Sequence, residues 1–273
     1  MRDNLIVVYL CYYKNNFTHV DKFINNYRKY KSGINHNLLI CFKNLDHDNI
    51  IFLKKKFKKI KYNFIVDNFG DYDIGSYFRL AKKYRKKDLF FIGSYSYPAI
   101  NNWLKIIYKN FAKNTLISSA GSYQSLTSDA FNNSYRYNNN LIYNFLLRII
   151  FFLKNIIYFP IFPNPHVRTN SFLIKAKDLL KYPYKLNYKR KFDCWRFESG
   201  RHSLTNFFKK KRFNIIIVNS KGNIFNKNSW KYSDTYFYEE QRNIIIKDKH
   251  TDLFNNSNKR NKLKLEKMVW GSN

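Results

Sequence analysis

DNFGDYDIGSY, residues 67–77, joins an apolar, strand-like run to a helix-like run. Residues 62–66 before it predict a buried strand, and residues 77–87 after it have the apolar spacing of a helix. Such turns lie at the carboxyl ends of strands in α/β sheets, where ligands bind. Glycine there lets the backbone approach a ligand, and the helix start offers unpaired N–H groups. The alternative is a capped loop, with Asp73 as N-cap and Gly70 at a positive φ.

Strands and helices alternate along the first half of the chain. Short apolar runs predict strands at 5–10, 37–42, 63–66, 88–92 and 115–118. Apolar residues at helical spacing predict helices at 18–31, 48–58, 74–85 and 101–111, with Ile51, Phe52 and Phe57 facing inward in the second of them. Because the strands are apolar on both faces, we predict an α/β domain with a mostly parallel, Rossmann-like sheet flanked by helices.

The second half is less regular. Its patterns predict a helix over 141–158, a loop at 160–165, a strand at 171–174, a helix at 177–181, a turn at 197–201, a helix at 203–211 and a strand at 214–218. From residue 219 onward we predict mostly loop. The sequence shows no internal repeat and no low-complexity linker, so we predict one domain over 1–273 with a C-terminal elaboration.

The segment 141–158 is strongly apolar, but Asn144, Arg148 and Asn155 fall close to one stripe, and Phe151 fills the gap in that stripe. Because charge interrupts the segment, we do not predict that it spans a membrane. Two interpretations stay open. The segment is either a core helix or a helix that lies in a membrane interface with its aromatic face down.

Composition and cysteine usage narrow the class of protein. Hydrophobic residues make up 45% of the 273, which is enough for a folded core. Cys11, Cys41 and Cys194 fit neither a disulfide framework nor a zinc site, which favours a reducing, cytoplasmic location. The apolar run 5–13 has no small-residue cleavage site, so we predict a first strand rather than a signal peptide.

The net charge of +32 is large enough to attract phosphates, nucleic acid or an anionic membrane surface. It is weak evidence for a partner, because the abundant Lys, Asn, Ile, Phe and Tyr all have A/T-rich codons. The basic runs 54–61, 82–87 and 209–212 fall near the ends of predicted helices, where solvated lysine is ordinary. We therefore expect no specific nucleic-acid partner.

Three groups of polar residues are candidates for a site. They are Asp67, Asn68, Gly70, Asp71, Asp73 and Gly75; then Gly93, Ser94, Tyr95 and Ser96; and then His166, Arg168 and Asn170 with Glu198, Ser199, Gly200 and Arg201. The first two groups follow neighbouring strands, so their loops are expected side by side. An acid at a strand end, in a chain with arginines to bind phosphate, suits transfer from a phosphorylated donor.

The element order around Asn68-Phe69-Gly70 and Asp73-Ile74-Gly75 resembles the nucleotide-binding half of GT-A glycosyltransferases. The chain also resembles bacterial glycosyltransferase-like proteins related to rhamnan-synthesis enzymes. They share the Asp-Ile-Gly turn, a Ser-rich strand end, the stretch FESGRHSLT at 197–205 and a terminal Trp270-Gly271. The resemblance spans nearly the whole chain, and FESGRHSLT is its most specific motif.

This resemblance implies a GT-A-like transferase that uses a nucleotide-sugar donor and a glycan or lipid-linked acceptor, as in surface polysaccharide synthesis at a cell envelope. Residues 1–120 would form the donor-binding half and 121–273 the acceptor side. The implied donor-binding residues are Asp67, Asn68, Gly70, Asp73, Gly75, Ser94, Tyr95, Ser96, His166, Arg168 and Arg201. Peripheral contact with the inner face of an anionic membrane is a further expectation.

The sequence departs from the GT-A pattern where the family has its acidic Asp-x-Asp metal motif, because this chain has Ser94-Tyr95-Ser96 there. Serine hydroxyls are poor ligands for Mn²⁺ or Mg²⁺. Either Asp71 and Asp73 supply the metal ligands, or no metal is used and basic residues neutralise the leaving diphosphate. We favour the second, because basic residues are plentiful.

Glu198 is the candidate general base for an acceptor hydroxyl, with Asp193 as the runner-up. The alternative for Glu198 is a helix-start or surface glutamate paired with Arg201. His166 would contact diphosphate or acceptor, or else be a hydrogen-bonded structural histidine. Two other functions stay open: a basic, aromatic-rich nucleic-acid-binding domain, and a non-catalytic transferase-like partner.

Asp67 and the serine loop are candidates for the donor's nucleotide part. The Asp67 carboxylate would accept a hydrogen bond from a base or ribose, and the alternative is a loop cap. Ser94 and Ser96 would line the diphosphate, and the alternative is ordinary turn polarity.

Overall fold

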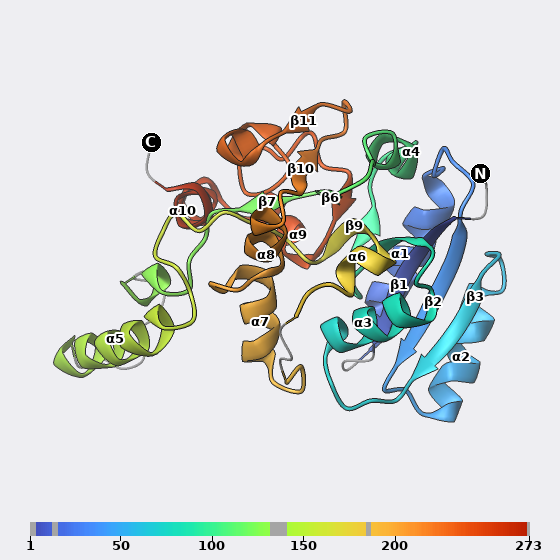
Figure 1. The fold of residues 1–273 in the computed structure, drawn as a ribbon, viewed down its shortest axis with the longest axis horizontal. Helices are drawn as coiled ribbons and strands as arrows, with labels where there is room; N and C mark the ends of the chain where they lie inside the picture. The colour runs from blue at the N-terminus through green and yellow to red at the C-terminus, as the bar shows by residue number, and fades with distance from the viewer. Residues whose placement is uncertain (1–3, 13–15, 132–140, 184–186, 272–273) are drawn as a thin grey trace.

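The computed structural model describes residues 4–12, 16–131, 141–183 and 187–271. A central eight-stranded sheet has the order β11-β10-β6-β9-β4-β1-β2-β3 (Figure 1). Its strands are β1 (Leu5–Tyr12), β2 (Asn37–Lys43), β3 (Asn63–Asp67), β4 (Asp88–Ile92), β6 (Thr115–Ser118), β9 (Ser171–Lys175), β10 (Asn214–Val218) and β11 (Ile224–Phe225). Two small antiparallel pairs complete the strands: β5 (Tyr97–Pro98) with β12 (Ile246–Lys247), and β7 (Gly121–Ser122) with β8 (His166–Val167).

Helices lie on both faces of this sheet. They are α1 (Thr18–Lys29), α2 (His47–Phe57), α3 (Asp73–Lys83), α4 (Trp103–Tyr108), α5 (Leu141–Ile156), α6 (Ala176–Leu179), α7 (Lys191–Ser199), α8 (Leu204–Lys210), α9 (Lys249–Asn255) and α10 (Lys259–Trp270), with 3₁₀ turns η1 (Ser128–Phe131) and η2 (Lys227–Ser233). One core layer packs α1, α2 and α4 on the sheet. The other packs α3, α7 and α8 on the opposite face.

The predicted fold class is confirmed: the chain is an α/β protein whose sheet is mostly parallel, flanked by helices and followed by a less regular C-terminal part. Strands β1, β2, β3 and β4 pair in parallel, as do β6 and β10. β9 is antiparallel to both β4 and β6, and β11 is antiparallel to β10. The predicted strands 5–10, 37–42, 88–92, 115–118, 171–174 and 214–218 all exist within about two residues of their bounds.

Two predictions on the edge of the sheet are wrong. β3 is an edge strand rather than a buried one, and its Phe64 and Val66 are 48% and 40% exposed. Ile51 and Phe52 of α2 are also exposed, whereas Leu53 and Phe57 face the core. The exposure of β3 follows from its position, because no further strand lies outside it among the described residues.

Three further predictions, on the bounds of helices and loops, are corrected by the structure. Residues 197–199 are the last turn of α7 rather than a loop turn. The region after 219, predicted to be mostly loop, contains α9 and α10. Finally, Asp73 is the first residue of α3, whose N-cap is Tyr72, so Asp73 is not the predicted N-cap.

The antiparallel strand β9 brings distant segments together. Ile92, the last residue of β4, pairs with Ser171, the first residue of β9. The loop before β9 therefore lies at the edge where β1, β2, β3 and β4 end. Ligands of open α/β sheets bind at this edge.

Candidate functional site

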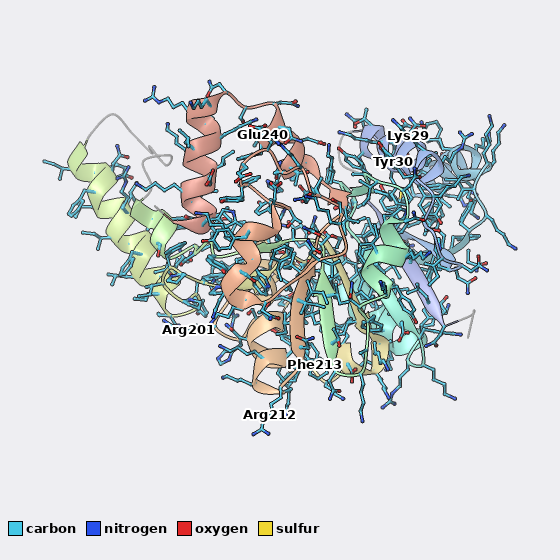
Figure 2. All side chains as sticks on the ribbon, turned by 90° about the horizontal axis from the view of Figure 1, so that it is seen from above. Lys29, Tyr30, Arg201, Arg212, Phe213 and Glu240 are labelled. Atoms are coloured by element: carbon cyan, nitrogen blue, oxygen red, sulfur yellow. The ribbon has the colours of Figure 1, made fainter. Side chains whose placement is uncertain are left out.

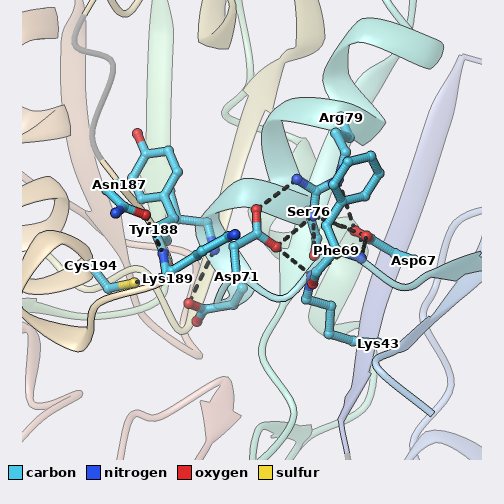
Figure 3. A network of polar contacts seen from close by, with 12 residues as sticks. Lys43, Asp67, Phe69, Asp71, Ser76, Arg79, Asn187, Tyr188, Lys189 and Cys194 are labelled. Atoms are coloured by element: carbon cyan, nitrogen blue, oxygen red, sulfur yellow. Dashed lines mark hydrogen bonds and ion pairs between the residues drawn. The ribbon is translucent and has the colours of Figure 1, made fainter.

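Asp67 and Asp71 share one buried network with two cations, Lys43 and Arg79 (Figure 3). The Arg79 guanidinium donates to Asp67 Oδ2 at 2.7 Å and to both oxygens of Asp71 at 2.7 Å. Lys43 Nζ donates to Asp71 Oδ1 at 2.5 Å and to the Phe69 carbonyl at 2.6 Å. The Phe69 N–H also donates to Asp67 Oδ1 at 3.2 Å, which is the loop-cap geometry. These carboxylates are engaged within the protein.

This network gives the fold an acid-sensitive component. Burial alone would raise the pKa of Asp67 and Asp71, but the hydrogen bonds from Arg79, with help from Lys43, hold both pKa values below the ordinary one. A depressed carboxyl pKa stabilises the folded state above the unfolded-state pKa of about 3.9. That stabilisation is lost as the pH falls through the folded-state pKa.

Asp71→Asn is therefore expected to destabilise the protein at pH 7, and to destabilise it less as the pH falls below the unfolded-state pKa. Urea unfolding of wild type and variant at pH 7 and at about pH 3 measures the difference. A stability difference that stays constant over this range would contradict the assignment.

Gly75 leaves room for the Asp71 carboxylate. A Cβ added at Gly75 would lie 1.8 Å from Asp71 Oδ2, whereas a Cβ at Gly70 would meet nothing within 4 Å. Gly70 and Asn68 are exposed at the loop tip, and the φ of Gly70 is not in the left-handed region, which corrects that prediction. Of the two glycines, only Gly75 has a steric requirement, and it comes from the ion network rather than from a ligand.

Gly75→Ala is expected to lower the free energy of unfolding by about 1–3 kcal/mol, because the added methyl group displaces Asp71 from Arg79. Gly70→Ala is the matched control, with an expected change within about 0.5 kcal/mol. Urea denaturation at pH 7 measures both. Equal stability of the two variants would show that Asp71 moves aside at no cost.

The serine loop and the third group of residues meet at the sheet edge. The Gly93 N–H donates to the Asn170 carbonyl at 2.8 Å, which ties the end of β4 to the start of β9. Ser94 and Ser96 are buried in this loop, where the Ser94 carbonyl accepts from the Tyr9 hydroxyl at 2.9 Å. Tyr95 lies between the ring of His19, 4.7 Å away, and Lys249, whose Nζ is 5.0 Å from the Tyr95 ring centre.

Arg168 is buried and paired. Its Nη1 lies 3.0 Å from Asp248 Oδ2, and its guanidinium carbon lies 4.0 Å from the ring centre of Tyr236. Asn170 Nδ2 donates to the same Asp248 oxygen at 3.0 Å. Asp248 is also the N-cap of α9, accepting from the backbone of His250 and Thr251. Arg168 therefore positions this edge and is not an open cation for a diphosphate.

Glu198, in the last turn of α7, is held as an ionised carboxylate. Its Oε2 accepts from the Thr169 N–H at 3.1 Å and from the Thr169 hydroxyl. Burial raises its pKa, but Arg168, His166 and the Thr169 hydrogen bonds together hold that pKa below the ordinary value. Among the hydrogen bonds of the described residues, none reaches Glu198 Oε1. Thr169 thus anchors one oxygen of the Glu198 carboxylate.

Asp73 faces the same region from the start of α3. Burial raises the pKa of Asp73, and the negative charge of Glu198 adds to the rise, while Lys191 opposes it. The Tyr72 N–H donates to the Tyr188 carbonyl at 2.7 Å, which ties the loop before α3 to the loop before α7. The carboxylates of Asp73 and Glu198, from two helices, therefore lie close enough to influence one another, and Lys191 lies near Asp73.

His166 is buried, and burial is the largest cause of its lowered pKa, so its imidazole is neutral at pH 7. Its Nδ1 lies 2.7 Å from the Asn164 carbonyl, which can only accept. The proton is therefore on Nδ1, and Nε2 keeps its lone pair.

Asp193 and Arg201, two of the predicted site residues, form their hydrogen bonds with residues other than Glu198. Both oxygens of Asp193 accept from arginines: Arg190 Nε at 2.9 Å and Arg196 Nη1 at 3.1 Å. Arg201 does not pair with Glu198; its Nε and Nη2 donate to the Ile156 carbonyl at 3.0 and 2.8 Å. Arg201 thus caps the C-terminal end of α5.

The sequence analysis missed Lys43, Arg79, Thr169, Tyr236, Asp248 and His250. Only one of them carries a local signal: Asp248 and Thr251 form a capping box, an N-terminal helix pattern that the sequence displays. The other contacts join residues that are far apart in the sequence.

A metal ion does not fit the residues assigned to it. Both oxygens of Asp71 are bonded to Arg79 and Lys43, and these cations would compete with a metal ion for them. Among the residues that the structure describes, no group of three or more His, Cys, Asp or Glu side chains is placed to hold a metal ion.

Comparison with known proteins assigns no family, since no family model and no curated protein matches the chain. Among solved structures, HddC from Yersinia pseudotuberculosis is 12% identical, with a TM-score of 0.40, over 77% of this chain and 97% of that chain. Mouse xyloside xylosyltransferase 1, in its apo form, is 7% identical, with a TM-score of 0.42, over 80% of this chain and 85% of that chain. These proteins are what the chain is similar to, at identities that show no family.

Proposed function

We propose that the protein is a glycosyltransferase that moves a sugar from a nucleotide-activated donor to a glycan or lipid-linked acceptor. One observation carries the proposal: Glu198 is an ionised carboxylate, anchored through one oxygen, at the edge of the sheet where β4 ends and β9 begins. The serine loop lies at the same edge, Asp73 lies near Glu198, and Lys191 lies near Asp73. A fixed base beside the proposed donor site suits deprotonation of an acceptor hydroxyl.

The donor would lie along the 93–96 loop and the start of α3. The buried Ser94 and Ser96 and the first-turn N–H groups of α3 supply donors for phosphate oxygens. In this proposal Lys191 helps to neutralise the leaving diphosphate, because Arg168 is buried against Asp248 and Arg201 is bonded to α5. We propose surface polysaccharide synthesis as the setting, on the resemblance of FESGRHSLT alone.

A thermal-shift screen against UDP-, GDP-, CMP- and dTDP-sugars, with and without Mn²⁺, tests the proposal. A ligand that binds only the folded state at about 100 times its Kd adds about 2.7 kcal/mol of stability, which is an easily measured shift. We expect a shift with one nucleotide class that does not require Mn²⁺. A shift only with Mn²⁺ would reject the metal-free proposal, and no shift with any donor at millimolar concentration would reject the transferase.

One observation favours a second candidate, the binding of nucleic acid. A hollow of about 670 Å³ at the opposite ends of β2 and β3 is lined by Tyr27 and Tyr62 with Arg28, Lys31, Lys59 and Lys61. Aromatic and basic side chains together suit single-stranded nucleic acid. Against it, most aromatic rings pack within the core, as Tyr9 does on Phe23. Salt-dependent oligonucleotide binding, without any nucleotide-sugar shift, would favour this candidate.

A further inference from the structure

The helix α5 has the reverse of the usual amphipathic orientation. Asn144 and Asn155, from its polar stripe, are 6% and 3% exposed and face the protein. Its apolar side chains face outward: Phe145, Leu146, Ile150 and Leu153 are each between 52% and 60% exposed. The apolar face of α5 therefore does not build the core, which contradicts the core-helix interpretation, one of the two left open by the sequence.

This face continues beyond the helix and is held in place. Ile157 and Ile161 are 67% and 57% exposed. The chain after α5 is fixed by hydrogen bonds, in which Ser125 and Thr127 donate to the Pro160 and Phe159 carbonyls. Figures 1 and 2 show α5 at one end of the molecule, extending away from the sheet. The apolar face of α5 and the segment after it is therefore held in a defined position by hydrogen bonds.

Basic side chains lie beside the C-terminal end of this apolar face. Arg201, which caps α5, lines a surface hollow of about 410 Å³ together with Pro160, Asn206, Lys209 and Lys210 (Figure 2 labels Arg201). Lys154 is exposed on α5 itself. At the same end of the molecule, α10 presents a hollow lined by Lys259, Arg260, Leu263, Lys264 and Lys267. Phosphate groups are the chemical partners of such clusters.

We propose that α5 and these flanking basic residues bind the surface of an anionic lipid bilayer, with α5 lying in the interface plane. An exposed apolar helix face bordered by lysine and arginine is the pattern of an interfacial helix. A second copy of the chain is a poorer occupant, because a symmetric contact would bring the basic clusters of two proteins of charge +32 together. In the part of the chain that the structure describes, no helix has the length and apolar content needed to cross a bilayer. The inference does not depend on the transferase proposal.

Vesicle flotation of the full chain tests the inference. The protein should float with phosphatidylglycerol-containing vesicles at low salt, bind pure phosphatidylcholine much more weakly, and lose affinity as salt rises. The triple variant Phe145→Ser, Ile150→Ser, Leu153→Ser should lower the partition coefficient by about a hundredfold or more. A matched triple variant at exposed apolar positions elsewhere, Ile51→Ser, Ile224→Ser, Leu253→Ser, should bind like wild type.

Two double variants test the contribution of the basic side chains to vesicle binding. Lys209→Glu with Lys210→Glu should weaken binding by about tenfold or more, whereas Lys59→Glu with Lys61→Glu, at the hollow near the ends of β2 and β3, should have a smaller effect. Unchanged thermal unfolding confirms that the variants fold. No flotation of wild type, or equal losses in test and control variants, would overturn the inference. So would light scattering that shows a dimer which the Phe145 triple variant dissociates.

Discussion

Replacing Glu198 by Gln is expected to lower kcat for sugar transfer by about 10²–10⁴-fold while leaving donor binding intact. The amide keeps the shape of the side chain, and its oxygen can still accept from the N–H and hydroxyl of Thr169. It cannot take a proton from an acceptor hydroxyl. Single-turnover transfer with a donor identified by the thermal-shift screen measures the effect, and thermal shift of the variant measures donor binding.

The matched control is Glu240→Gln, because Glu240 is 55% exposed and, among the described residues, forms an ion pair with Lys262 alone. It should transfer sugar like wild type. The lowered pKa of Glu198 also predicts that transfer stays active down to pH values below the ordinary glutamate pKa of about 4.3. Turnover by Glu198→Gln equal to wild type would remove Glu198 as the base, and loss of donor binding would assign it to donor recognition instead.

Replacing Asp248 by Ala is expected to cost about 3–5 kcal/mol of unfolding free energy. The substitution leaves the Arg168 guanidinium, 8% exposed, without its carboxylate. It also removes the N-cap of α9 and the hydrogen bond from Asn170. Urea unfolding at pH 7 measures the loss. The result also bears on the site, because Arg168 lowers the pKa of Glu198.

The comparison is Glu240→Ala, which breaks an ion pair of similar length, 2.8 Å, at the surface and should cost at most about 1 kcal/mol. Should Asp248→Ala fail to fold, the double variant Arg168→Met with Asp248→Ala keeps the test open. Removal of both charges should restore part of the stability. An Asp248→Ala protein as stable as Glu240→Ala would show that water, rather than Asp248, compensates Arg168.

Much of the fold was predictable from local pattern. The strands β1, β2, β4, β6, β9 and β10 are short apolar runs with few alternatives, because burial on both faces requires apolar residues at every position. The helix α8 was predictable from the Ser203 cap, which accepts from the Asn206 N–H. By contrast, α7 has almost no apolar periodicity in KFDCWRFES, so its last turn was assigned to a loop.

The candidate site was predictable in part. Asp73, the serine loop, His166, Arg168 and Glu198 do lie at the carboxyl edge of the sheet. The hydrogen-bond partners and pKa shifts of these groups were not predictable, because they depend on residues that are distant in the sequence. Lys43 lies 24 and 28 residues from Asp67 and Asp71, and Asp248 caps a helix that the sequence analysis did not predict.

The sequence by itself determined the α/β class, the six apolar strands named above and the polar character of the turns after β3 and β4. Only the tertiary structure decided that β9 runs antiparallel beside β4, and hence that Asn170 meets Gly93. It also decided that α5 turns its asparagines inward and its apolar face outward. The physical reason is that periodicity fixes which residues share a face, whereas sheet order and the orientation of that face depend on contacts between distant segments.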